Sequence, residues 1–81
     1  MGCDSFIYEK RIYGKNSDFI LRLKQTIHGW DFGEDLMDCL NSVHGYQHIS
    51  VKQLQGLFIK HNIEPKFDLD PDKIFVVYVS Y

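Results

Sequence analysis

The fold is decided by the stretch from Ser50 to Tyr81, which reads SVKQLQGLFIKHNIEPKFDLDPDKIFVVYVSY. Ser50 and Gln53 are spaced as a capping box, in which each residue satisfies a free backbone N–H at the start of a helix. The apolar spacing that follows predicts a helix over about Val51 to His61. Asn62 can end this helix in a left-handed conformation.

The remainder of this stretch predicts a hairpin of two strands. The first strand spans Ile63 to Phe67, and its Pro65 indicates an edge position. The second strand spans Lys73 to Tyr81, and its almost continuous apolar character is typical of a strand buried on both faces. Residues 68–72 carry carboxylates at alternate positions but lack the later glycine and glutamate of a calcium loop, so an Asp-Pro turn is expected. We therefore place the second strand between the first strand of the chain and the edge strand.

The first half of the chain predicts one strand and two helices. Cys3 to Tyr13 alternates as a strand and is followed by a turn at Gly14-Lys15-Asn16. Phe19, Ile20, Leu23 and Ile27 follow helical spacing, so a helix capped by Asn16 or Ser17 is expected to run to about His28 and to stop at Gly29. A second helix is expected from about Gly33 to His44, with Asp31 and Glu34 as a capping pair and Gly45 as its end.

These elements make one α+β domain over residues 1–81. The expected order is β-α-α-α-β-β, with a three-stranded antiparallel sheet packed on three helices. A chain of 81 residues is the size of a single domain, and its hydrophobic fraction of 44% is that of a packed protein.

The charge of the chain is unevenly distributed although its net value is only −2. Residues 1–29 hold five basic groups against three acidic ones, and residues 50–81 hold four of each. Residues 30–49 hold Asp31, Glu34, Asp35 and Asp38 with no Lys or Arg. A nucleic-acid-binding domain usually has a concentrated basic face, so this distribution argues against a nucleic-acid partner and favours a protein with a basic surface.

The sequence predicts a reduced protein of the cytoplasm with no membrane partner. The first apolar run is interrupted by Glu9-Lys10-Arg11, unlike a signal peptide, and no stretch approaches the roughly 18 apolar residues of a membrane span. Cys3 and Cys39 are too few for a disulfide framework, and Cys39 is expected to be a free, partly buried thiol.

No pattern of catalytic or metal-binding residues stands out. His28, His44, His48 and His61 lack the spacing of a zinc site, and a pair formed by Cys39 and a histidine would lack a third, orienting residue. We therefore expect no enzyme activity, no cofactor and no metal.

The expected order of elements over residues 17–81 resembles the winged-helix version of the helix-turn-helix. The resemblance implies a DNA-binding transcriptional regulator whose last helix enters the major groove. The outward side chains of that helix would be Lys52, Gln53, Gln55, Lys60 and His61. The chain departs from the family's charge pattern, because it has no Arg over residues 23–81 and would carry Asp68, Asp70 and Asp72 on the wing.

The opening Met1-Gly2-Cys3-Asp4, with Glu9-Lys10-Arg11 and Gly14-Lys15 behind it, resembles the start of small uncharacterised phage and bacterial proteins that begin Met-Gly-Cys-Asp-Ile-His. This resemblance covers about residues 1–15 and implies a phage accessory protein. Small, acidic, non-enzymatic phage proteins are in turn similar to the stoichiometric inhibitors of bacterial defence systems, such as anti-CRISPR proteins.

The sequence therefore leads to a small non-enzymatic binding protein, a phage anti-defence inhibitor, with the winged-helix regulator as the alternative. The expected contact residues are Glu34, Asp35 and Asp38 on one exposed helical face, together with Tyr46. The competing interpretation of the acidic residues is a solvated face whose first carboxylates complement the helix dipole. The excess of tyrosine fits either strand surfaces or a binding face. The apolar run of the strand over Lys73 to Tyr81 also fits an interface, so a homodimer through the sheet is a further expectation.

Overall fold

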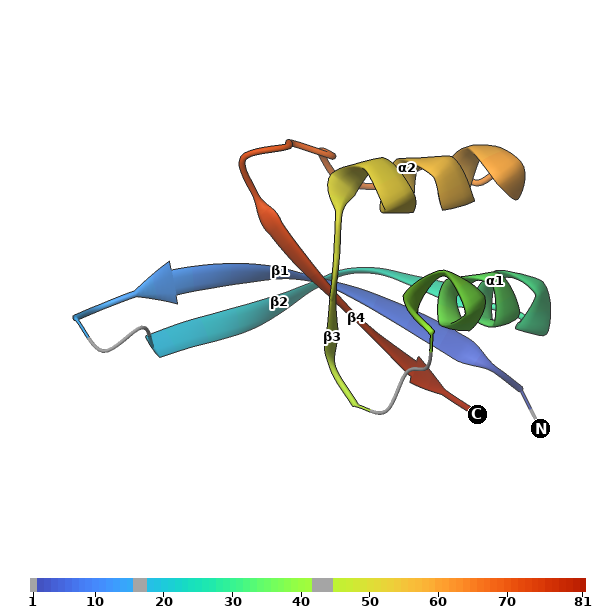
Figure 1. The fold of residues 1–81 in the computed structure, drawn as a ribbon, viewed down its shortest axis with the longest axis horizontal. Helices are drawn as coiled ribbons and strands as arrows, with labels where there is room; N and C mark the ends of the chain where they lie inside the picture. Colours follow the sequence, from blue (N-terminus) through green and yellow to red (C-terminus); the bar gives the residue numbers. More distant parts are fainter. Residues whose placement is uncertain (1, 16–17, 42–44) are drawn as a thin grey trace.

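The computed structural model describes residues 2–15, 18–41 and 45–81, and shows an α+β fold (Figure 1). The elements in chain order are β1 (Asp4–Tyr13), β2 (Asp18–His28), α1 (Trp30–Leu40), β3 (Gln47–Ile49), α2 (Val51–Lys60) and β4 (Ile74–Ser80). Four strands form one antiparallel sheet in the order β2-β1-β4-β3. The expectation of three strands on three helices is therefore wrong, because the described residues form four strands and two helices.

The largest correction concerns residues 18–28, which form a strand instead of the predicted helix. Apolar residues stand at every second position in Phe19, Leu21 and Leu23, so the segment fits a strand as well as a helix. The turn at Gly14-Lys15 decides between the two, because it returns the chain beside β1 and lets β2 pair with it from Asp18 to His28. Gly29 consequently links β2 to α1 with φ 116° and does not end a helix.

The helix expected over residues 33–44 is present but displaced. α1 begins three residues earlier, at Trp30, and its N-cap residue, Gly29, makes no side-chain hydrogen bond, so the expected capping pair of Asp31 and Glu34 does not form. α1 ends at Asn41, whose φ of 63° is left-handed, and not at Gly45. The expected caps Asn16 and Ser17, and the expected helix end at His44, lie outside the described residues.

The prediction of a hairpin near the C-terminus is correct for one of its two strands. Residues 63–67 form no strand, and β4 instead lies between β1 and the three-residue strand β3. The interior position of β4 is confirmed, since Phe75 and Val77 are at most 1% exposed. The turn before β4 is also confirmed, because the side chain of Asp70 accepts a hydrogen bond of 2.9 Å from the backbone N–H of Asp72.

The hydrophobic core lies between the two helices and one face of the sheet. β1 and β4 direct Cys3, Ser5, Ile7, Phe75, Val77 and Val79 to this face, and the helices supply Phe32, Leu36, Leu54, Leu57 and Phe58. α1 approaches the strands so closely at Gly33 that a Cβ atom there would lie 2.5 Å from the Cys3 Sγ. Only glycine fits at this position, so the small residues of this region set the distance between helix and sheet.

The β1–β2 hairpin extends beyond the rest of the molecule. β1 pairs with β4 only as far as Lys10, whereas it pairs with β2 to the end of the hairpin. Figure 1 shows the two strands continuing together past β4, β3 and both helices. We call this protruding part, Arg11–Tyr13 of β1 and Asp18–Ile20 of β2, the arm.

A bulge in β2 changes which of its residues face the helices. Ile7 lies opposite Gln25 and Tyr8 lies opposite Leu23, so Lys24 has no counterpart in β1. Residues after the bulge face the helices at odd positions, whereas residues before it face the helices at even positions.

Ser50→Ala tests the most clearly confirmed local prediction. The Ser50 hydroxyl accepts a 3.1 Å hydrogen bond from the Gln53 N–H, and the Gln53 side chain accepts one of 3.2 Å from the Ser50 N–H. Removing the hydroxyl is expected to cost about 1 kcal/mol of unfolding free energy and to lower the melting temperature by roughly 4–8 °C. Thermal unfolding followed by circular dichroism measures the change, and an unaltered midpoint would contradict it.

Candidate functional site: the open face of the sheet

One face of the sheet is packed against the helices, and the opposite face carries aromatic and aliphatic side chains. The strand registers define this second face, because alternate residues of paired strands point to the same side. We call it the open face. Its members are Asp4, Phe6, Tyr8, Lys10 and Ile12 of β1, Phe19, Leu21, Leu23, Thr26 and His28 of β2, His48 of β3, Ile74, Val76, Tyr78 and Ser80 of β4, and Tyr46 just before β3.

A cluster of aromatic rings occupies the centre of the open face. The ring of Tyr46 lies 5.5 Å from that of Tyr8, in an edge-to-face arrangement, and 5.2 Å from that of Tyr78. Phe6 extends the cluster, with its ring 6.3 Å from that of Tyr78. Burial and the neighbouring Tyr46 raise the pKa of the Tyr8 hydroxyl. Pairs of this geometry add stability beyond their buried area, so the cluster holds the open face in one arrangement.

A hollow of about 310 Å³ lies beside this cluster and is mostly apolar. Its lining residues are Lys10, Phe19, Leu21, Tyr46, His48 and Val76. The Nζ of Lys10 lies 4.6 Å from the centre of the Phe19 ring and 3.1 Å from the Nε2 of His48. Lys10 therefore donates to the imidazole while its charge rests over an aromatic ring, which fixes one cation at the rim of an apolar depression.

The open face also exposes several large apolar side chains to solvent. Five of its large apolar side chains are between 39% and 59% exposed, namely Ile12, Phe19, Leu23, Tyr46 and Ile74. Single exposed apolar side chains are ordinary, but a contiguous group of them on one face usually marks an interaction site.

The acidic residues chosen from the sequence lie on α1, on the other side of the sheet. Glu34 and Asp38 are exposed, whereas Asp35 is only partly exposed. The fourth chosen residue, Tyr46, belongs to the open face and does not join them. The four residues therefore lie on two separate surfaces.

Asp35 is already neutralised within the molecule. Its Oδ2 accepts hydrogen bonds from the Lys60 Nζ at 3.0 Å and from the His61 Nε2 at 2.6 Å. The hydrogen bond from Lys60 and the one from His61 lower the pKa of the Asp35 carboxyl. His61 also packs edge-to-face on Phe32, with ring centres 5.5 Å apart. Asp35 thus joins α1 to the end of α2, which leaves Glu34 and Asp38 as the outward carboxylates of the sequence-based site.

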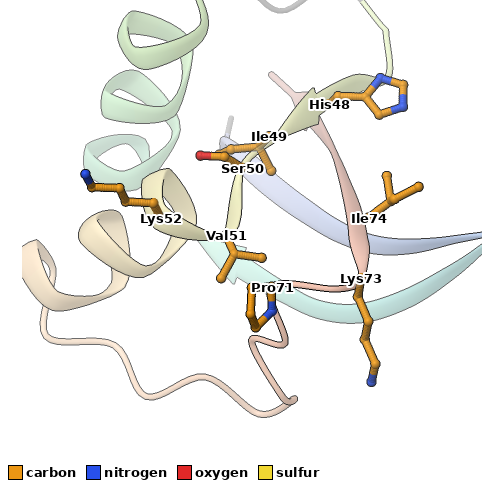
Figure 2. Close-up of a pocket in the computed structure, with 8 residues that line it drawn as sticks. All are labelled: His48, Ile49, Ser50, Val51, Lys52, Pro71, Lys73 and Ile74. Atoms are coloured by element: carbon orange, nitrogen blue, oxygen red, sulfur yellow. The ribbon is translucent and has the colours of Figure 1, made fainter.

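A second hollow, of about 500 Å³, lies at the start of α2 and is shown in Figure 2. Its walls include the apolar side chains of Ile49, Val51, Pro71 and Ile74, and its basic residues are His48, Lys52 and Lys73. Figure 2 shows these three basic side chains pointing away from one another. The Nζ of Lys73 is also 3.4 Å from the carboxylate of Glu9, so the basic groups do not converge on an anion.

Two of the remaining reactive side chains, Glu9 and Cys3, are buried. Glu9 is buried on the helix side of the sheet, with Lys73, Arg11 and Lys24 within 4.0 Å. Cys3 is buried, and burial raises the pKa of its thiol, which lowers its reactivity. Cys39 is exposed, so the expectation of a partly buried thiol is wrong.

No group of three potential metal ligands is found within residues 2–15, 18–41 and 45–81. Three histidines make hydrogen bonds to other side chains: His28 to Asp4 at 2.7 Å, His48 to Lys10, and His61 to Asp35. His44 lies outside the described residues. Within the same ranges no helix is long and apolar enough to cross a membrane.

The topology behind the winged-helix resemblance is absent. A strand replaces its first helix, and the segment that should form one side of the wing, residues 63–67, is not a strand. The helix expected to enter DNA is α2, which buries Leu54, Leu57 and Phe58 and ties Lys60 to Asp35. Lys52, Gln53 and Gln55 remain exposed on it.

The open-face residues of β2 were missed because their strand was assigned as a helix. A helix over residues 18–28 would place Ile20, Leu23 and Ile27 on one face. The strand instead places Phe19, Leu21 and Leu23 on one face. The alternation of Phe19, Leu21 and Leu23, opposite an alternating β1, was the signal that could have identified the surface.

Comparison of the chain with protein-family models, with curated proteins and with solved structures produced no match. The candidate site therefore rests on the geometry of the chain itself.

Asp35→Asn tests the link between α1 and α2 through its dependence on pH. The folded protein lowers the pKa of Asp35 below its ordinary value of 3.8, so the unfolded chain binds this proton at a higher pH than the folded protein does. The stabilisation is complete above that value and disappears as the pH falls through the lowered pKa. We expect the variant to be less stable than the wild type at pH 6 and to approach it in stability as the pH falls through the lowered pKa of Asp35.

Urea unfolding at several pH values measures this difference. Asp38→Asn serves as the matched control, because Asp38 lies on the same helix with an exposed side chain and should show little change across the range. A constant difference between the Asp35→Asn variant and the wild type from neutral to acid pH would contradict the assignment.

Proposed function

We propose that this protein is a small non-enzymatic binding domain that holds a partner protein on the open face of its sheet. The observation that carries the proposal is the group of five apolar side chains exposed there beside a preformed aromatic cluster. Burying apolar surface of this kind supplies roughly 25 cal/mol per Å², which makes it the main source of affinity available to the chain.

The chemistry of the open face indicates the kind of partner surface that fits it. Apolar and aromatic side chains dominate the face, and the cation of Lys10 stands at the rim of the hollow. A complementary surface would be apolar with a carboxylate at its margin, placed to meet Lys10. The preformed ring cluster of Tyr8, Tyr46 and Tyr78 limits the side-chain ordering that binding requires, which favours affinity.

The acidic side of α1 is the second candidate contact, and its partner would have a basic surface. Glu34 and Asp38 are exposed there, and Asp38 lies one turn after Glu34 on the same helix. Their charge would speed association and make it sensitive to salt, but it offers little apolar area to hold the complex. The open face is therefore the stronger candidate of the two.

The narrower role is inhibition of a bacterial defence system by a phage protein acting in the host cytoplasm. This role is supported by the resemblance of residues 1–15 to the start of small phage and bacterial proteins. It is also supported by a binding surface suited to one-to-one capture of a protein. It is tested by expressing the chain in bacteria that carry a defence system and counting phage plaques, with the open-face variant described below as the control. Equal plaque counts with the wild type, the variant and an empty vector would contradict the role for that system.

The binding proposal is tested by comparing two surfaces of the same molecule. Tyr46→Ser combined with Ile74→Ser removes two exposed apolar groups from the open face, while Ile59→Ser removes one from α2, where Ile59 is 73% exposed. A tagged wild-type chain is first used to isolate a partner from bacterial lysate, and the partner is then purified and titrated. We expect the open-face variant to bind it roughly tenfold or more weakly, a loss of about 1.4 kcal/mol, and the Ile59→Ser control to bind it as the wild type does.

A third variant separates the open face from the acidic helix. Glu34→Lys combined with Asp38→Lys reverses two exposed charges and leaves Asp35, which joins the helices, in place. Weaker binding in this variant, with full binding by the open-face variant, would transfer the site to α1 and contradict the proposal. Circular dichroism spectra of all variants confirm that each is folded before binding is compared.

A further inference from the structure

β2 is an edge strand with a long free side. The sheet order places β1 on one side of β2, and within the described residues no strand pairs with its other side. β2 is eleven residues long, whereas the opposite edge, β3, has only three. Natural edge strands are usually short or interrupted, since a row of unpaired backbone N–H and C=O groups can pair with another chain.

The regular part of this edge is limited to seven residues. The bulge at Lys24 ends the regular alternation of β2. Beyond it, the side chain of Gln25 is tied to the segment after α2, accepting a hydrogen bond of 2.9 Å from the Lys66 N–H and donating one of 3.3 Å to the Glu64 carbonyl. Residues 18–24 therefore form the part of the edge available for pairing.

We propose that β2 pairs with β2 of a second copy of this chain, antiparallel and centred on Leu21. The two four-stranded sheets then form one continuous sheet of eight strands, related by a twofold axis through the two Leu21 residues. A symmetric pairing of this kind is closed, because each copy uses the one long free edge found among its described strands.

The sequence of the edge is complementary to itself in this register. Leu21 faces Leu21 of the second copy, and Phe19 faces Leu23, so three open-face side chains of each copy meet apolar partners. Asp18 faces Lys24, which gives two ion pairs of opposite charge related by the twofold axis. Ile20 faces Arg22, whose aliphatic stem can lie along the isoleucine.

The neighbouring registers are less favourable. A pairing centred on Arg22 places the two Arg22 side chains directly opposite each other, and like charges in that position are destabilising. A pairing centred on Leu23 places Arg22 opposite Lys24, with the same consequence. A pairing centred on Ile20 keeps Asp18 opposite Arg22 but extends only from Asp18 to Arg22, which is two residues shorter. The register centred on Leu21 is thus the longest without opposed like charges.

This pairing also extends the open face. The twofold axis is perpendicular to the sheet, so the open faces of the two copies lie on the same side and join at Phe19, Leu21 and Leu23. The rings of Tyr46 and Tyr78 lie toward the far side of each sheet, away from the shared edge. The dimer is therefore compatible with the proposed partner site and does not depend on it.

The first experiment measures association of the unmodified chain and of two variants, one in β2 and one in β1. Sedimentation equilibrium from micromolar to near-millimolar concentration is expected to show a reversible dimer. Leu21→Glu places two carboxylates at the twofold axis, while within one copy it lies opposite Lys10 on β1. We expect it to raise the dissociation constant of the dimer roughly tenfold or more. Ile12→Glu, on the same face but on β1, is the matched control and should leave the constant unchanged.

The second experiment tests the register by disulfide formation, in a Cys39→Ser background that removes the exposed native thiol. Leu21→Cys is expected to cross-link with itself under mild oxidation, because directly opposed strand residues have Cα atoms about 4.5–5.5 Å apart, within the range of a disulfide. Phe19→Cys alone and Leu23→Cys alone should cross-link slowly, whereas a mixture of these two variants should cross-link to each other.

Two results would overturn the proposal. One is a chain that stays monomeric over the whole concentration range. The other is Leu21→Cys cross-linking no faster than Phe19→Cys alone, which would mean that the register is different. Failure of this proposal is distinguishable from failure of partner binding, because the Tyr46→Ser and Ile74→Ser changes lie outside β2 and are expected to leave the dimer intact.

Discussion

The helices of this protein are too short to cover its sheet, and this mismatch of lengths shapes the whole molecule. α1 and α2 have eleven and ten residues, so each is about 15–17 Å long at 1.5 Å per residue. β1 and β2 have ten and eleven residues and reach about 33–36 Å at 3.3 Å per residue. Two such helices can cover one face of the sheet where β1 and β4 meet, and no more. The arm remains beyond the ends of the helices, and the open face remains because both helices lie on the opposite side of the sheet.

The boundary between the covered and uncovered parts is marked by charge. Glu9 is the last buried residue of β1 on the helix side, and it is surrounded by Lys73, Arg11 and Lys24. The core on one side of it is apolar, and the strand residues on the other side are exposed. An ion-pair cluster at this point satisfies a carboxylate that could not remain charged deeper in the core. The arm therefore begins where the helices end.

Sequence reasoning succeeded where one local signal had only one structural solution. The box of Ser50 and Gln53 defines a helix start whatever surrounds it, and the unbroken apolar run of β4 requires a position between two other strands. It failed at residues 18–28, where the apolar residues fit both the helical and the strand period. Only pairing with β1 decides that this segment is a strand. The same failure hid part of the open face, since Phe19, Leu21 and Leu23 come from β2. The acidic residues of α1 were found from the sequence. That Asp35 joins the two helices while Glu34 and Asp38 face outward depends on Lys60 and His61 at the end of α2, which are distant in sequence.

The bulge at Lys24 has a consequence for how the gene of this protein can change. The side of the sheet that each residue of the arm occupies is determined by counting from the bulge, not by the chemistry of the side chain. Lys24 is the one residue of the strand without a counterpart in β1, so deleting its codon would place Leu23 next to Gln25 and restore regular alternation. Phe19, Leu21 and Leu23 would then stay on the open face. In a strand without a bulge, the loss of one residue turns every side chain beyond it to the other side of the sheet. The bulge thus makes β2 tolerant of a one-codon deletion at this point.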